Sequence, residues 1–143
     1  YRLCSDFENS RIYPGIPEYI NERGRGMYHY LTGSASWLLL TVLTEVYGVK
    51  GRLGDLMLEP KLLKGWFDGD GQASVRTIFA GRDIIVTYLN PQGKEYGEYA
   101  VRRISINGEA IGFESVKGGA VISRGRIEGL EAGEMSRIEV LLG

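Results

Sequence analysis

The chain has 143 residues, enough for one ordinary domain or for a small domain joined to part of another. Seventeen Lys and Arg residues against eighteen Asp and Glu leave a net charge of −1. Both signs are interspersed, so the sequence presents no basic face for nucleic acid. The single cysteine, Cys4, excludes an internal disulfide and fits a reducing compartment, so we expect a cytoplasmic protein.

The first residue is Tyr1 rather than Met, and no charged and then apolar leader opens the chain. Its longest apolar stretch, around residues 37–46, is interrupted by two threonines and by Glu45. We therefore expect no membrane-spanning segment. The start at Tyr1 indicates a piece cut from a longer protein.

Residues 13–19, Tyr-Pro-Gly-Ile-Pro-Glu-Tyr, predict a shaped loop, because two prolines and a glycine exclude a helix there. The aromatic side chains around this loop are sufficient to line a sugar-sized pocket. They are Tyr13, Tyr19, Tyr28, Tyr30 and Trp37. Simple packing of the loop is an equally open interpretation.

Residues 31–37, Leu-Thr-Gly-Ser-Ala-Ser-Trp, lead into an apolar run of helical length. This pattern predicts that Thr32, Gly33 and Ser34 lie at a helix N-terminus, where backbone N–H groups lack partners and attract anions. Arg23 and Arg25, just upstream, are placed to add charge-assisted bonds. The residues thus suggest a phosphate or carboxylate site, although spacing alone favours an ordinary helix cap.

The helix itself is expected over residues 34–47, where small and apolar residues recur at steps of three and four, and Gly48 is expected to end it. Apolar residues cover most of its circumference. Such a helix must be buried among other elements, and this sequence does not contain the rest of that bundle.

After Gly51 the hydrophobic period changes to two, which is typical of strands. Asn107-Gly108 predicts a two-residue hairpin turn. The strands are expected around residues 56–58, 73–79, 83–89, 101–106, 109–111, 121–123 and 137–142. The fold class is therefore mainly β with an N-terminal α segment, the β part being an antiparallel β-sandwich, jelly-roll-like.

Two motifs in this half have competing interpretations. Asp68-Gly69-Asp70-Gly71 superficially suggests a calcium loop, but it is too short for an EF-hand and lacks the distal Glu, so we predict a solvated turn. Trp66 with Phe67 is either a sugar platform or a plug between the two halves of the chain. We favour the plug, because the preceding residues 60–63 must fold back on the helical half.

The run from Tyr13 to Leu62 resembles the C-terminal part of glycoside hydrolase family 94, the inverting disaccharide and oligosaccharide phosphorylases. The match is most specific at the Leu-Thr-Gly-Ser-Ala-Ser-Trp core, the following helix and the Gly-Asp-Leu and Pro-Lys-Leu steps of residues 54–62. The resemblance implies an (α/α)6 barrel followed by a small jelly-roll domain. Residues 1–50 would be the end of the barrel with its last helix, and residues 51–143 the C-terminal β-sandwich domain.

The resemblance also implies a reaction, in which phosphate attacks the anomeric carbon of a β-linked gluco-oligosaccharide and gives an α-sugar 1-phosphate. The family's Thr-Gly pair, a phosphate ligand, corresponds to Thr32 and Gly33, and Ser34 either joins them or caps the helix. An Arg and a His that complete the family's phosphate site lie upstream and are absent here. We expect at least one of Arg23 and Arg25 to face the sugar-phosphate pocket, and His29 to be a packed or hydrogen-bonded residue rather than a catalytic one.

The general acid of such a reaction is an Asp from the barrel, and no residue of this chain matches it. The chain alone should therefore be inactive and hold no catalytic residue. Glu18 and Tyr19 are the candidate sugar-binding residues of the loop, ahead of Glu22, although Glu18 could equally stabilise the loop. No cofactor or metal is expected, and inorganic phosphate counts as a substrate.

The implied partners are an oligosaccharide, phosphate and the missing N-terminal barrel, with a homodimer suggested by the family; nucleic acid and membrane are not among them. A carbohydrate-binding module that uses Trp66 is one alternative. A purely structural sandwich and part of a cyclic glucan synthase are two others.

Overall fold

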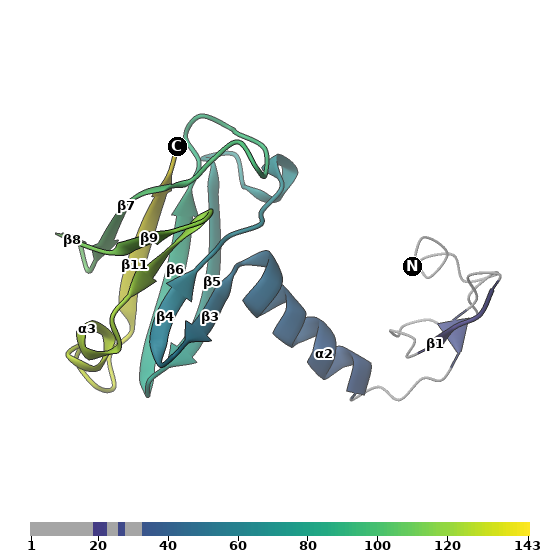
Figure 1. Ribbon diagram of the computed structural model, residues 1–143, viewed down its shortest axis with the longest axis horizontal. Coiled ribbons are helices and arrows are strands. Elements are labelled where there is room, and N and C mark those ends of the chain that lie inside the picture. Colours follow the sequence, from purple (N-terminus) through teal and green to yellow (C-terminus); the bar gives the residue numbers. More distant parts are fainter. Residues whose placement is uncertain (1–18, 23–25, 28–32) are drawn as a thin grey trace. The chain divides into compact units, whose positions relative to one another are not determined.

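A computed structural model of the chain describes residues 19–22, 26–27 and 33–143. The chain divides into two compact units, Tyr1–Thr41 and Val42–Gly143. Figure 1 shows the elements of both units along the chain.

The first unit contributes a short antiparallel pair, β1 (Tyr19–Ile20) with β2 (Gly26–Met27), and the helix α2 (Gly33–Thr41). The helical stretch continues in the second unit as the π-helix η1 (Val42–Val46). The predicted helix over residues 34–47 is thus confirmed in its extent. Gly48 follows it with a φ of +66°, the left-handed conformation that favours glycine at the end of a helix.

The second unit contains two sheets. The first is antiparallel, with the strand order β3-β4-β10-β9. Its strands are β3 (Val49–Arg52), β4 (Asp55–Leu58), β9 (Glu114–Val116) and β10 (Gly119–Ile122).

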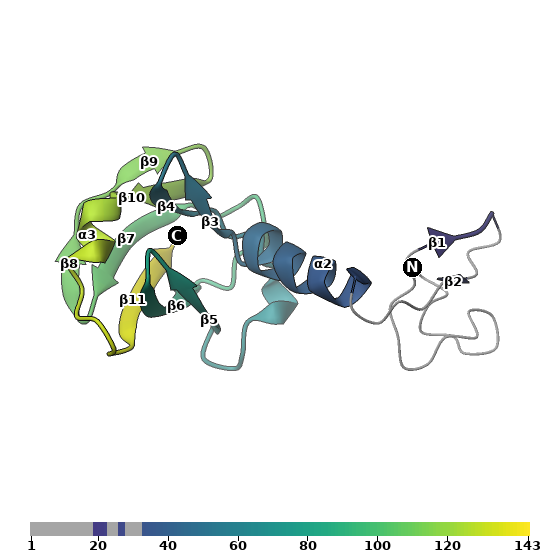
Figure 2. The ribbon, with the colours of Figure 1, turned by 90° about the horizontal axis from the view of Figure 1, so that it is seen from below.

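The second sheet has the order β5-β6-β11-β7-β8. Its strands are β5 (Gln72–Phe79), β6 (Arg82–Leu89), β7 (Val101–Ile106), β8 (Glu109–Ile111) and β11 (Ser136–Leu142). Two short helices, η2 (Lys64–Trp66) and α3 (Arg124–Glu128), lie in the connections. Figure 2 shows the two sheets as separate layers.

The core lies between these layers and takes apolar side chains from both. Leu56 and Leu58 of β4 are fully buried, as are Ile84 and Val86 of β6. In β11 burial alternates along Ser136–Leu142, as expected of a strand with one face on a core. The predicted β-sandwich is confirmed.

The prediction that every strand pairs antiparallel is wrong at one position. β11 runs parallel to β6, from Ser136 opposite Ile84 to Leu141 opposite Leu89, and antiparallel to β7 on its other side. The hydrophobic period fixes which face of a strand is buried, but it carries no information on the direction of the neighbouring strand.

The Asn107-Gly108 hairpin is confirmed between β7 and β8, with both residues at positive φ. The strands β3 and β9 and the helix α3 were not predicted, because each is short and carries little apolar periodicity. In the described part of the chain, no helix combines the length and the apolar character that a membrane crossing requires.

The helix α2 carries large apolar side chains that are exposed. Trp37 and Leu39 are each 71% exposed, and Leu38 and Leu40 about half. That this helix is covered by elements of a longer protein stays a prediction.

Candidate functional site

The residues predicted to bind phosphate lie at the start of α2. The helix begins at Gly33, so Thr32 directly precedes it in the chain, and Ser34 is in its first turn. Thr32 itself lies outside the described residues, as does the side chain of Ser34. The first turn contains no acidic residue, so the partial positive charge of this helix end is not neutralised from within α2.

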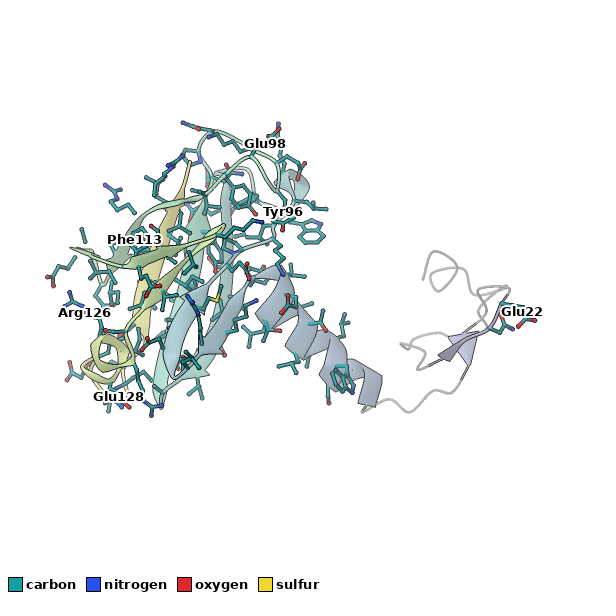
Figure 3. The ribbon with its side chains drawn as sticks, in the orientation of Figure 1. Glu22, Tyr96, Glu98, Phe113, Arg126 and Glu128 are labelled. Carbon is teal, nitrogen blue, oxygen red and sulfur yellow. The ribbon has the colours of Figure 1, made fainter. Side chains whose placement is uncertain are left out.

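Of the candidate sugar-binding residues, the structure describes Tyr19 and Glu22. Tyr19 is in β1 and is paired with Met27 of β2 in the strand register. Glu22, exposed in the turn that follows β1, is labelled in Figure 3. Glu18, Arg23 and Arg25 fall outside the described residues, as does His29, so their roles stay predictions.

The end of the helical stretch is fixed to the sandwich by backbone bonds. The Glu59 N–H donates to the Gly48 carbonyl, and the Lys61 N–H donates to the Val46 carbonyl, each at 2.9 Å. A Cβ on Gly48 would lie 1.9 Å from the Glu59 oxygen, so only glycine allows this approach.

Charged side chains surround the same junction. Glu45 accepts a 2.6 Å hydrogen bond from Lys61 Nζ and lies 3.5 Å from Lys50 Nζ. The bond from Lys61, with the charge of Lys50, lowers the pKa of the Glu45 carboxyl, and the bond to Glu45 raises the pKa of Lys61. All these side chains are partly exposed, so the pairs contribute little to stability.

Two buried tyrosines hold this part of the chain through their hydroxyl groups. Tyr88 donates to the Tyr47 carbonyl at 2.6 Å, and Tyr99 accepts from the Leu62 N–H at 2.7 Å. Burial raises the pKa of both phenols, that of Tyr99 to about 12. Both groups therefore stay protonated at neutral pH and are structural rather than acid–base residues.

A cavity of about 310 Å³ opens in the second unit, where η2 and the following turn meet the loop after β6. Lys64, Phe67 and residues 68–71 line one side, and Asn90, Pro91 and Gly93 line the other. The two sides are joined at 2.8 Å, where the Asn90 N–H donates to the Gly71 carbonyl. This end of the sandwich, where Tyr96 and Glu98 lie, is opposite the end that carries α3 (Figure 3).

The predicted turn at residues 68–71 forms one wall of this cavity. One carboxylate oxygen of Asp68 accepts the N–H groups of Asp70 at 3.0 Å and Gln72 at 2.8 Å, which closes the turn. The sequence indicated the turn but not the cavity. The opposite wall comes from residues about twenty positions further on, and only the pairing of β5 with β6 brings the two together.

Trp66, favoured above as a plug between the halves of the chain, is 52% exposed, and Phe67 packs against the core. That Trp66 is covered in a longer protein stays a prediction.

Within the described residues, no group of three or more His, Cys, Asp and Glu side chains is arranged to hold a metal ion. No protein-family model matches this chain, and no curated protein matches it.

Proposed function

We propose that the chain is the C-terminal part of an inverting glycoside phosphorylase that cleaves β-linked gluco-oligosaccharides with inorganic phosphate. In this proposal α2 is the last helix of an (α/α)6 barrel, and the sandwich is the domain that follows it. The observation that carries the proposal is the start of α2 at Gly33, directly after Thr32, within the Leu-Thr-Gly-Ser-Ala-Ser-Trp sequence.

The chemistry of that helix start suits a phosphate oxygen. The first N–H groups of a helix have no partner within the helix, and they point along its axis toward any bound anion. Gly33 lets an oxygen approach the backbone without a Cβ in the way, and Thr32 adds a hydroxyl donor. No acidic side chain lies in the first turn of α2, so nothing within the helix offsets the partial positive charge of its start.

The apolar surface of α2 supports the second part of the proposal. Trp37 and Leu39 are 71% exposed and Leu38 and Leu40 about half, and a group of neighbouring exposed apolar side chains is typical of an interaction surface. A neighbouring helix of a barrel would cover them. Oligosaccharide, phosphate and the barrel are thus the proposed partners, and the acid that protonates the leaving oxygen would come from the barrel.

The test compares Thr32→Val with Thr41→Val in the longer enzyme that contains this chain. Thr41 ends the same helix, so its substitution controls for the loss of a threonine hydroxyl elsewhere in α2. Loss of a hydrogen bond to a charged group should raise the KM for phosphate by roughly 10- to 100-fold in the first variant and leave it unchanged in the second. The chain alone should release no sugar 1-phosphate.

Equal phosphate KM values in the two variants would exclude Thr32 as a phosphate ligand. Release of sugar 1-phosphate by the chain alone would show that the general acid lies within it.

A further inference from the structure

We propose that the cavity between η2 and the loop after β6 binds a sugar ring, as a carbohydrate site on the sandwich itself. This site uses no residue of the predicted phosphate site, so the inference is independent of the proposed function. The argument depends on the size of the cavity, its polar groups and its fixed walls.

The volume suits one ring. About 310 Å³ is at the lower end of the range of small-molecule pockets, roughly 300–1,000 Å³. A Cβ on Gly71 would lie 2.9 Å from the Asn90 backbone oxygen, so a glycine is needed where the two walls meet.

Three charged groups of the lining are free to meet a ligand. Asp70 makes no side-chain hydrogen bond or ion pair with any described residue. Lys64 Nζ makes none either, and its charge interacts only at longer range with the Glu95 carboxylate, whose pKa it helps to lower. Asp68 uses one carboxylate oxygen to close the turn, and its second oxygen has no partner in the described part of the chain.

This combination of charges favours a neutral ligand with many hydroxyls. Two carboxylates disfavour a phosphate or another anion, and the ammonium of Lys64 offsets part of their attraction for a cation. Sugar hydroxyls can donate to Asp70 and Asp68 and accept from Lys64 at the same time. The apolar face of a sugar ring needs a flat surface, and Phe67 and Pro91 provide apolar lining of that kind.

The walls are held in place by interactions that a ligand would not disturb. The side chain of the buried Asn90 donates to the Lys94 carbonyl and accepts from the Lys94 N–H, which fixes the loop after β6. The Lys64 N–H donates to the Glu95 carboxylate at 2.9 Å, which fixes η2 to the same loop. That bond is the main cause of the lowered pKa of Glu95. A preformed site loses little entropy on binding.

The exposed aromatic residues nearby could extend the surface for a longer glycan. Trp66 belongs to η2 together with Lys64, and it is 52% exposed. Tyr96, labelled in Figure 3, follows Glu95 in the loop fixed to η2 and is 50% exposed.

The experiment titrates the chain with cellotetraose and follows the backbone amides by NMR. Amide shifts at Gly69, Gly71 and Gly93 report binding in the cavity. In a Trp37→Phe variant Trp66 is the only tryptophan, so its fluorescence gives a second readout of binding near η2. We expect saturable shifts at these glycines with a Kd on the order of 1 mM. Sorbitol, which has hydroxyls but no ring face, should bind at least about fivefold more weakly.

The variants are Asp70→Asn and Lys64→Gln, because neither side chain supports the fold through a hydrogen bond or ion pair among the described residues. The matched controls are Glu134→Gln and Lys117→Gln, which are exposed residues outside the cavity. Each cavity variant should weaken binding at least about fivefold, and each control should leave it unchanged.

Absence of saturable shifts at the three glycines up to about 20 mM cellotetraose would overturn the proposal. Shifts confined to other residues, or equal losses in the control variants, would overturn it as well. None of these outcomes depends on phosphate, so a failure here is distinct from a failure of the Thr32 experiment.

Discussion

The sharpest structural prediction concerns Gly48, the residue that ends the helical stretch. Gly48 has a φ of +66°, so Gly48→Ala introduces backbone strain. The added Cβ would also lie 1.9 Å from the Glu59 backbone oxygen, which is a clash. Gly81 has a similar φ of +72° in the turn between β5 and β6, with nothing within 4 Å of the corresponding Cβ. Gly81→Ala is therefore a control that carries the strain without the clash.

The two costs can be separated in magnitude. An L residue in the left-handed region costs about 1–2 kcal/mol, which is the whole effect expected at Gly81. At Gly48 the Glu59 backbone must also move, which adds roughly 2–3 kcal/mol or more and endangers the Glu59 to Gly48 hydrogen bond. The excess corresponds to a Tm about 10–20 °C lower in a domain of this size.

A third variant, Gly71→Ala, should fall between the other two, because its φ is +72° and its Cβ would lie 2.9 Å from the Asn90 oxygen. Urea unfolding followed by circular dichroism measures the free energy of unfolding of each variant. If Gly48→Ala does not fold, the comparison of Gly71→Ala with Gly81→Ala still tests the reasoning, because Gly71→Ala should lose more free energy of unfolding. Equal losses in the three variants, or the largest loss at Gly81, would refute it.

Two further predictions concern hydrogen bonds and pH. Tyr99→Phe leaves the buried Leu62 N–H without its 2.7 Å partner and should lower the free energy of unfolding by about 1–3 kcal/mol. The control Tyr96→Phe, at a half-exposed side chain, should change the free energy of unfolding by less than about 0.5 kcal/mol. Similar losses for the two variants in urea unfolding would contradict this prediction. The Arg76 guanidinium donates to the Asp83 carboxylate and lowers the pKa of that carboxyl. The Arg76–Asp83 ion pair therefore contributes fully to stability above the unfolded pKa of Asp83, about 4, and this contribution is lost as the pH falls through the lower pKa of the folded state. Arg76→Gln should move the Asp83 pKa upward in an NMR titration, as should 1 M salt, and an unchanged pKa would show that the ion pair does not form in solution.

Much of the fold could be predicted from local patterns. The β-branched run of residues 73–79 and the apolar run of residues 83–89 predicted β5 and β6 almost to their ends, and Asn107-Gly108 predicted the β7–β8 turn. In each case the residues that determine the element lie within it. β3 was not predicted because Val49 is the only buried residue of this strand, and the strand forms through its pairing with β4.

Features that join distant segments could not be predicted. The parallel register of β11 with β6 joins residues about fifty positions apart. The hydrophobic period of a strand does not indicate whether the neighbouring strand runs parallel or antiparallel to it. The cavity has the same origin, because Asp68 and Asn90 lie in different loops and only the β5–β6 pairing brings them together.

The place of β11 between β6 and β7 also has a consequence for how the chain reaches its native state. Until Ser136–Leu142 leaves the ribosome, the β5–β6 and β7–β8 hairpins each present an open edge and no common sheet exists. Completion requires β11, the last of these five strands to be made, to enter the middle of the layer and pair with partners far back in the sequence, a kind of step that is slow. The newly made hairpins are thus exposed to pairing with other chains during synthesis, and this interval is when a chaperone would be most useful.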